Sequence, residues 1–205
     1  MSTDVTLDAL TPLHAIMGAW AAWVLSWFVA SVWSRRTVAR PGWIGAVAHY
    51  IPTVFGALLL FSRQSDYDTS TLGLMERRLW HVGAPLGWLL FALAVASFTF
   101  TWWARLWLGS LWSSTVTRKT GHRVVDTGPY RLVRHPIYTG LIAAGFFTAL
   151  EIGTMLALIG AAVMSLGWWM KARVEERFLT QELGPDYADY RRRTAMLVPF
   201  LKLPG

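Results

Sequence analysis

The sequence predicts an all-α protein that crosses a membrane with about five helices. Of its 205 residues, 54% are hydrophobic and only 15% are charged, and the mean hydropathy is +0.38. A typical soluble domain carries about 25% charged residues. The chain also has 13 tryptophans, a residue type that is enriched at the two membrane interfaces. These observations favour a single polytopic membrane domain, 1–205, over a soluble enzyme.

Three apolar segments are long enough to cross a bilayer unaided. They run over 13–33, 42–61 and 84–104. The hydrocarbon core of a bilayer needs about 20 apolar residues in a helix, and each of these segments meets that length. We therefore expect the first half of the chain, 1–104, to contribute three spans.

Two further spans are expected in the second half, 105–205. The segment 136–150 measures only about 22 Å as a helix, against a core of about 30 Å. The next span begins near residue 154 and continues as a helix to 179. We expect these two spans to form a hairpin that turns at 151–153 and leads into a cytoplasmic helical segment.

Small residues on the fifth span predict close packing of helices. Gly160 and Gly167 lie at heptad spacing, and such small residues let another backbone approach in lipid. The fourth span offers Gly140, Ala144 and Gly145 as the partner face. We interpret this stripe as packing rather than chemistry.

The basic residues predict the orientation. Of the 19 Lys and Arg residues, 16 follow the first, third and fifth spans, and only Arg63, Arg77 and Arg78 lie on the other side. The positive-inside rule places the side with 16 in the cytoplasm. We expect a bacterial-type inner membrane protein with its N-terminus outside and its C-terminus in the cytoplasm. Because the net charge of +7 lies in the gaps between spans, it does not indicate nucleic-acid binding.

Several kinds of site are excluded or not expected. The chain has no cysteine, so disulfides, thiolate metal sites and thiol nucleophiles are excluded. No two histidines fall at a metal-ligand spacing with carboxylates, so no metal is expected. There is also no glycine-rich dinucleotide fingerprint and no phosphate loop. His14, His49 and His81 lack ionisable neighbours in the sequence pattern and are interpreted as packing residues, with His49 flagged for its depth in the membrane.

Polar residues gather on both sides of the predicted hairpin. The segment 122–140 leads into the fourth span, with Pro136 at a helix start and His135 at the cap position. The fifth helix leaves the bilayer through 171–179. A hairpin brings both segments together at the cytoplasmic surface. The alternative is that these residues have no role in chemistry. Arg131 and Arg134 would then only set the orientation in the membrane, the tyrosines would lie at the membrane interface, and the glutamates would be solvated charges of the C-terminal tail.

The motifs in this half resemble a known family. They are Gly128-Pro129-Tyr130, Arg134-His135-Pro136-x-Tyr138-x-Gly140, Glu175-Glu176-x-x-Leu179, Gly184-x-x-Tyr187-x-x-Tyr190 and Pro199. In order and spacing they are similar to the isoprenylcysteine carboxyl methyltransferase and phospholipid methyltransferase family. The resemblance covers about residues 105–200, and the first two spans carry no comparable motif.

The resemblance implies S-adenosylmethionine as methyl donor, bound at the cytoplasmic face, and a lipophilic acceptor that enters from the bilayer. The residues implied to line the donor are His122, Arg123, Val124, Val125, Tyr130, His135, Pro136, Ile137, Tyr138 and Glu175. A basic residue four positions before Glu175 faces the acceptor in this family. In this chain that position is Lys171, where Arg is usual. A lysine cannot bind a carboxylate through bidentate hydrogen bonds, so carboxylate recognition of that kind is not implied. Arg173 is the second candidate for contacting the acceptor.

The catalytic candidates are His135, Glu175 and Glu176. Glu175 can bind an amino or hydroxyl group of the donor, and His135 or Glu176 can take the proton of an amine acceptor. The acceptor stays open between a lipid carboxylate, a phospholipid amine and a hydrophobic thiol. Two other hypotheses remain, a nicotinamide-dependent membrane reductase of the sterol-reductase type and a non-catalytic membrane scaffold. The sequence does not address the oligomeric state.

Overall fold

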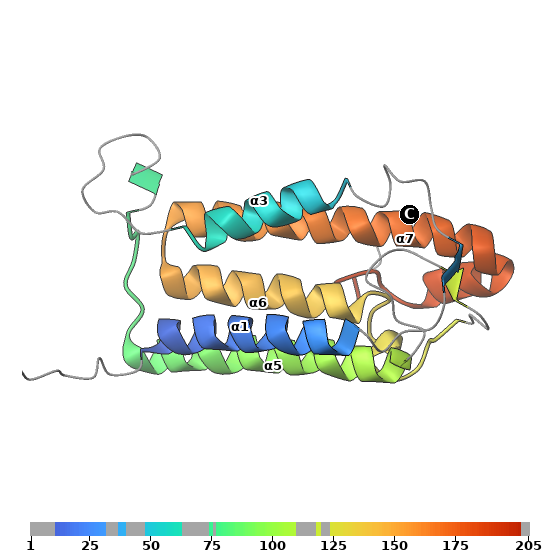
Figure 1. The fold of residues 1–205 in the computed structure, drawn as a ribbon, viewed down its shortest axis with the longest axis horizontal. Helices are drawn as coiled ribbons and strands as arrows, with labels where there is room; N and C mark the ends of the chain where they lie inside the picture. Colours follow the sequence, from blue (N-terminus) through green and yellow to red (C-terminus); the bar gives the residue numbers. More distant parts are fainter. Residues whose placement is uncertain are drawn as a thin grey trace, which may run out of the picture.

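The part of the chain that the structure describes forms a bundle of five α-helices lying side by side (Figure 1). The computed structural model describes residues 11–31, 37–39, 48–62, 74–75, 77–109, 118–119 and 124–201. The helices are α1 (Pro12–Ser31), α3 (Tyr50–Leu60), α5 (Ala84–Leu108), α6 (Pro136–Ile152) and α7 (Met155–Arg193). Helices α1, α5 and α7 run in one direction, and α3 and α6 return (Figure 1).

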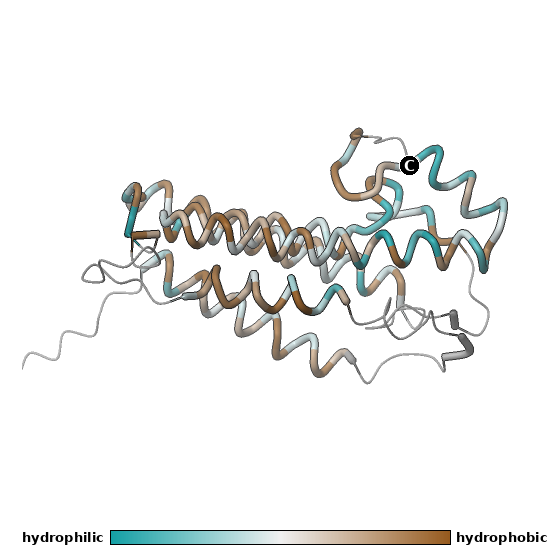
Figure 2. Tube along the Cα trace, turned by 90° about the horizontal axis from the view of Figure 1, so that it is seen from above, coloured by the Kyte–Doolittle hydropathy of each residue, from teal (hydrophilic) through white to brown (hydrophobic). Residues whose placement is uncertain are grey.

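The all-α membrane fold predicted from the sequence is confirmed. By length and composition, α1, α5 and α7 can each cross a membrane, whereas α3 and α6 are shorter apolar helices of 11 and 17 residues. The predicted second span began at residue 42, and its first residues lie outside the described part of the chain. Hydrophobic residues occupy the middle of the bundle, and hydrophilic ones gather at the end that carries the C-terminus (Figure 2).

A short ribbon joins two of the predicted cytoplasmic loops. Strand β1 (Thr37–Ala39) follows α1, strand β2 (Arg118–Lys119) follows α5, and the two pair antiparallel. The pairing requires both loops to lie at the same end of the bundle. This agrees with the side that the basic residues assign to them.

The hairpin between α6 and α7 turns where the sequence predicts. Helix α6 begins at Pro136 with His135 as its cap residue and ends at Ile152. Gly153 follows in the left-handed conformation, with φ of 76°, which glycine adopts without strain. Thr154 then caps α7 by accepting a hydrogen bond from the Ala157 N–H at 3.1 Å. Helix α6 is about 25 Å long, so it falls short of a bilayer core of about 30 Å, as expected.

The glycine stripe of α7 packs, but against a different helix from the one predicted. A Cβ added to Gly160 would lie 2.3 Å from the Leu60 nitrogen, and one added to Gly167 would lie 2.7 Å from the Thr53 nitrogen, so both glycines face α3. Gly140 of α6 instead faces Ser97 on α5. The expectation that α6 partners this stripe was wrong for Gly140, whereas a Cβ added to Gly145 would lie 2.5 Å from the side chain of Met164 on α7. The glycines of α7 themselves are occupied by the backbone of α3.

Two tryptophans of α1 form hydrogen bonds between helices inside the bundle rather than lying at the membrane interface. The indole N–H groups of Trp20 and Trp23 on α1 donate to Thr148 and Thr101 at 2.9 and 2.7 Å. A buried indole N–H needs such a partner. These bonds tie α1 to α6 and α5, so the high tryptophan count is only partly explained by interfacial belts.

The last part of the chain folds back over the polar end of the bundle. Helix α7 is interrupted at Gly184, with φ of 58° and ψ of −132°, and Pro185 follows. The chain then returns to the start of α6, where Arg134 and His135 donate backbone N–H bonds to Ala195 and Met196 at 2.9 and 3.1 Å. This return holds the C-terminal segment against the residues that precede α6.

Candidate functional site

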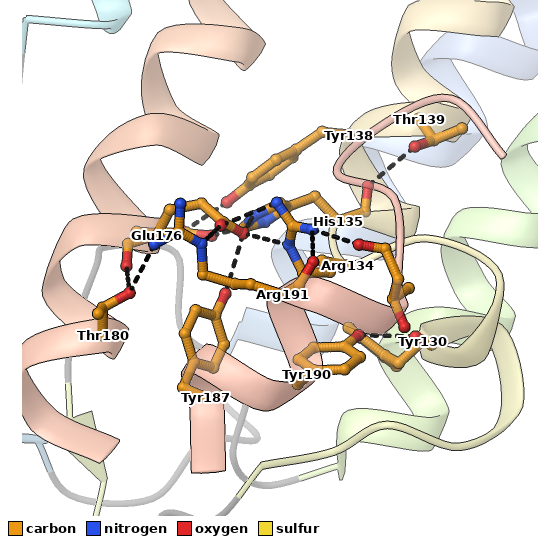
Figure 3. A network of polar contacts seen from close by, with 12 residues as sticks. Tyr130, Arg134, His135, Tyr138, Thr139, Glu176, Thr180, Tyr187, Tyr190 and Arg191 are labelled. Atoms are coloured by element: carbon orange, nitrogen blue, oxygen red, sulfur yellow. Dashed lines mark hydrogen bonds and ion pairs between the residues drawn. The ribbon is translucent and has the colours of Figure 1, made fainter. Parts of the chain in front are cut away.

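Polar residues that were predicted to meet do lie together, where α6 begins and beside the middle of α7 (Figure 3). The short helix η2 (Gly128–Arg131) leads into the segment that ends at His135, the cap of α6. Opposite it lies the part of α7 that carries Glu175 and Glu176. The close-up shows side chains from both segments converging on Glu176 (Figure 3).

Glu176 is the centre of this network. The residue is 4% exposed, and five hydrogen bonds or ion pairs reach its two carboxylate oxygens. Arg134 contributes two of them, with Nε 2.8 Å from Oε1 and Nη2 2.9 Å from Oε2. Arg191 Nε lies 2.9 Å from Oε2, His135 Nε2 lies 2.8 Å from Oε1, and the Tyr187 hydroxyl donates to Oε1 at 3.0 Å. A buried carboxylate is costly unless it is paired in this way, so Glu176 holds the site together.

His135 bridges the two glutamates. Its Nε2 faces Glu176 at 2.8 Å, and its Nδ1 lies 3.3 Å from Glu175 Oε2. Burial alone lowers the pKa of His135, but the hydrogen bonds and negative charges of Glu175 and Glu176 outweigh burial and raise it above the usual value. With a carboxylate at each ring nitrogen, the imidazolium form donates from both.

Glu175 and Tyr138 form the second half of the site. The Tyr138 hydroxyl donates to Glu175 Oε1 at 2.6 Å, and its ring stacks on those of His135 and Trp168, with centroids 5.5 and 5.3 Å apart. The Lys171 ammonium is buried and lies 5.3 Å from the centroid of the Tyr138 ring. Glu175 carries fewer hydrogen bonds than Glu176 among the described residues, and its side chain is 17% exposed.

The folded-back end of α7 supplies residues to which sequence analysis gave no role. Tyr187 and Arg191 reach Glu176, and the Tyr190 hydroxyl donates to the carbonyl of Tyr130 at 2.6 Å. Tyr187 and Tyr190 belong to the family motif, and the Gly184-Pro185 pair marks the break. These signals indicate a fold-back, but not which carboxylate it covers.

The other predicted donor-lining residues surround the same region. Pro136 and Ile137 are buried in the first turn of α6, and Val124 and Val125 pack against the core cluster that contains Tyr130 and Tyr138. His122 and Arg123 lie outside the described residues.

Of the two acceptor-side candidates, only Lys171 points into the cluster. Its ammonium lies over the rings of Tyr138 and Trp168, at 5.3 and 5.7 Å from their centroids. The Arg173 guanidinium instead lies 5.8 Å from the ring centroid of Trp169, whose side chain is exposed. Lys171 is therefore the better placed of the two for an acceptor that reaches this cluster.

His49 is buried, and its interpretation as a packing residue stays a prediction. The sequence pattern shows no ionisable neighbour of His49, whereas in the folded chain Lys171 and Glu175 on α7 contribute to its electrostatic surroundings. The neighbours come from α7, more than 120 positions along the chain, so no local pattern around His49 indicates them.

Comparison with known proteins agrees with the motifs. Residues 88–181 match the model of the isoprenylcysteine carboxyl methyltransferase (ICMT) family. The resemblance of this region to that family, predicted from the motifs, is therefore confirmed.

Curated relatives carry three kinds of name. Methanethiol S-methyltransferase 1 of Bradyrhizobium diazoefficiens is 39% identical over 71 residues, which are 35% of this chain and 24% of that protein. Protein-S-isoprenylcysteine O-methyltransferase B of Arabidopsis thaliana is 29% identical over 87 residues, 42% of this chain and 44% of that protein. Cobalt-zinc-cadmium resistance protein CzcN of Cupriavidus metallidurans is 33% identical over 102 residues, 47% of this chain and 45% of that protein. The chain thus spans less than half the length of each of these relatives.

Proposed function

We propose that this chain, which is ICMT-like across residues 88–181, is an integral-membrane methyltransferase that uses S-adenosylmethionine and a lipophilic acceptor. The observation that carries the proposal is the convergence of His135, Tyr138 and Glu175 on one buried spot at the polar end of the bundle. Relatives that are named as methyltransferases for a thiol and for an isoprenylcysteine support the reaction type.

The described residues fit such a donor. The indole N–H of Trp168 is buried and has no hydrogen-bond partner among them, as expected of a group that bonds to a polar ligand atom. Its ring stacks on Tyr138, which in turn holds Glu175. Glu175 has acceptor capacity left for an amino or hydroxyl group, because a carboxylate accepts about four hydrogen bonds. When bound, the donor supplies a methyl group on a positively charged sulfur.

Each residue of the network then has a distinct role. Glu175 binds and orients the donor, and Tyr138 fixes the Glu175 carboxylate. His135 holds the two glutamates at a constant separation. Glu176 keeps the segment before α6, helix α7 and the folded-back end in register through its five contacts. Most of the rate enhancement would come from approach and orientation, which contribute about 7–11 kcal/mol in well-aligned reactions.

The position of the site at the polar end suits reactants of opposite solubility. A charged, water-soluble donor does not cross hydrocarbon, and a lipophilic acceptor loses free energy when it leaves hydrocarbon. The short α6 allows polar backbone and side chains to lie at membrane depth where protein surrounds them. We propose that this end faces the cytoplasm of a cell membrane, with openings to water for the donor and to lipid for the acceptor.

The experiment that tests this function is a titration of the purified protein with two cofactors. We expect S-adenosylhomocysteine to bind and to raise the thermal unfolding temperature, since a ligand that binds the folded state stabilises it. We expect no such effect from the reduced nicotinamide dinucleotide phosphate. The reverse result would establish the reductase alternative, and no effect from either compound would favour a scaffold.

The acceptor class follows from a second measurement. Lipids and small molecules extracted from cells that lack or overproduce the protein would be compared by mass spectrometry. We expect a pair of compounds that differ by one methylene group. A carboxylate, an amine and a thiol give products of different chemistry, so the same pair assigns O-, N- or S-methylation.

A further inference from the structure

The last four described residues, Val198, Pro199, Phe200 and Leu201, form a turn that is exposed throughout. Phe200 is 94% exposed, and Val198 and Leu201 are 55% and 50% exposed. Within the turn, Leu201 donates its backbone N–H to the Val198 carbonyl at 3.1 Å. Hydrophobic side chains grouped on a surface in this way indicate a contact with something outside the described chain.

The backbone of this turn does not favour phenylalanine. Pro199 occupies the second position of the turn, and Phe200 occupies the third with a φ of 66°. Glycine adopts such a left-handed conformation without a steric cost and is the usual third residue of a turn that requires it. The Phe200 ring is neither buried nor suited to its backbone, so the fold of the described residues gives no reason for it. Local conflicts of this kind are concentrated at positions that serve a function.

The turn lies at the end of a lipid-facing stripe of α6. Thr139, in the first turn of α6, donates its hydroxyl to the Leu197 carbonyl at 2.6 Å, directly before the turn. The exposed residues Phe146 and Leu150 follow Thr139 at helical spacing and therefore share its face of α6. Figure 2 shows the last hydrophobic stretch of the chain standing out sideways beside the hydrophilic end of the bundle. This is the position expected of a segment at the surface of the lipid.

The same segment is bonded to residues of the candidate site. Arg134 and His135 donate their backbone N–H groups to the carbonyls of Ala195 and Met196, at 2.9 and 3.1 Å. With the Thr139 bond, three consecutive residues, 195–197, are thus attached to the segment that enters α6. A contact that fixes the turn therefore also fixes the residues around His135.

We propose that the turn 198–201 anchors the C-terminal segment in the lipid surface beside the start of α6, with the Phe200 ring inserted among the lipids. Removal of the ring from water supplies the driving force. Interfacial segments use Phe and Leu in this way and insert about 5–10 Å, to the boundary between headgroups and acyl chains. Pro199 has no N–H, and the Leu201 N–H is already bonded, so few backbone groups lose water there.

The anchor also favours binding of the donor, and this second part rests on the proposed function. A C-terminal segment held by lipid keeps Arg134 and His135 in the arrangement that the donor binds. A segment that is free to leave holds that arrangement for only a fraction of the time, and the apparent affinity falls by that fraction.

The absence of cysteine allows the anchor to be tested with a single spin label. The full chain carries the label at Leu201→Cys and is placed in lipid discs of phosphatidylcholine and phosphatidylglycerol. Collisions with oxygen, which concentrates in lipid, and with a water-soluble nickel chelate report the surroundings of the label. Phe146→Cys is the lipid reference. Gln181→Cys is the water reference, since it is exposed and lies about 39 Å along α7, beyond a core of about 30 Å.

We expect the Leu201 label to resemble the Phe146 label while Phe200 is intact, and to resemble the Gln181 label when Phe200→Gly is added. Glycine suits the backbone of the turn and removes only the ring, whereas Phe200→Leu keeps an apolar side chain. In the same discs, we expect Phe200→Gly to weaken binding of S-adenosylhomocysteine about tenfold, which corresponds to a segment in place about a tenth of the time. Phe200→Leu should bind it as the parent protein does.

A Leu201 label that resembles the Gln181 label in the presence of Phe200 overturns the anchor. Broadening by coupling between labels, removed by dilution with unlabelled protein, also overturns it, because a second copy of the chain would then cover the turn. Equal affinities of the parent protein and Phe200→Gly, or equal losses in Phe200→Gly and Phe200→Leu, overturn the link to the donor site. If the parent protein does not bind S-adenosylhomocysteine, the proposed function falls, whereas the label alone still decides whether the turn is an anchor.

Discussion

Arg134 grips Glu176 with two hydrogen bonds, of 2.8 and 2.9 Å, across 42 positions of sequence. The pair is almost fully buried, with side-chain exposures of 10% and 5%. Arg134 also donates to the carbonyls of Arg191, at 3.1 Å, and Thr194. One arginine thus joins the start of α6, the middle of α7 and the folded-back end of the chain, so the integrity of the site depends on this ion pair.

We predict that Glu176→Gln destabilises the protein strongly. The substitution leaves the buried Arg134 with an uncompensated positive charge and removes one ion pair each from Arg191 and His135. Breaking a buried pair costs about 3–5 kcal/mol. Thermal unfolding in a mild detergent measures the loss. Asp189→Asn is the matched control, since its ion pair with Arg192 is exposed and should contribute little. Equal stability of the two variants would contradict the central role of Glu176.

We predict that Glu175→Gln and His135→Ala each lower methyl transfer by one to several orders of magnitude while the protein remains folded. The Glu175→Gln variant would bind the donor less well, and the His135→Ala variant would no longer hold the two glutamates in place. Each tenfold loss in rate corresponds to about 1.4 kcal/mol of activation free energy. Initial rates with a radiolabelled methyl donor measure this. His14→Ala and His81→Ala serve as controls, and equal losses in all four variants would mean that the residues are structural.

We predict that the stabilising effect of His135 depends on pH. Its pKa is raised in the folded protein because Glu175 and Glu176 hold the charged ring against the cost of burial. The contribution is therefore complete below the unfolded value of 6.5 and is lost as the pH rises through the higher folded value. The difference in unfolding temperature between the parent protein and His135→Gln should be larger near pH 6 than near pH 9. A difference that grows with pH would contradict this.

We predict that Gly160→Ala destabilises the bundle and Gly18→Ala does not. A Cβ on Gly160 would lie 2.3 Å from the Leu60 nitrogen and 2.8 Å from the Gly56 oxygen, so α3 and α7 would have to separate. Overpacking of this kind costs about 1–3 kcal/mol. Gly18 has no atom within 4 Å of an added Cβ, so it is a control of the same chemistry on α1. Unfolding temperatures of the two variants in the same detergent decide the matter.

We predict that a reporter fused after Gly205 works only if it is of a type active in the cytoplasm. The reason is the 16-to-3 division of basic residues between the two sides. The pairing of β1 with β2 places two of the three basic regions at one end of the bundle. If a reporter that works only in the periplasm were active at that position, the predicted orientation would be wrong. The site would then lie on the side of the membrane opposite to the cytoplasmic donor.

The local features of this site could be predicted from the sequence because they depend on residues that are neighbours in the chain. Pro136 has no N–H and therefore favours the first position of a helix, which fixed His135 as its cap. The hairpin at 151–153 then required 135–138 and 171–176 to meet. These conclusions depend on neighbouring residues and on the order of spans, and both are readable along the chain.

The remaining features depend on contacts between distant segments. Glu176, rather than Glu175, receives five hydrogen bonds or ion pairs because the chain folds back at Gly184 and brings Tyr187 and Arg191 over one face of α7. The place of His49 depends on which helix fills the glycine stripe of α7. Side chains on two helices acquire such neighbours only through the packing angle and register, and sequence periodicity does not specify either.

An experimentally determined structure of the protein with S-adenosylhomocysteine tests the proposed site most directly. We predict ligand density between the segment from Gly128 to Gly140 and the stretch of α7 from Lys171 to Glu176, with Glu175 in hydrogen-bond contact with the ligand. Density at the other end of the bundle, near the turn between α6 and α7, would contradict the proposed site and the mechanism drawn from it.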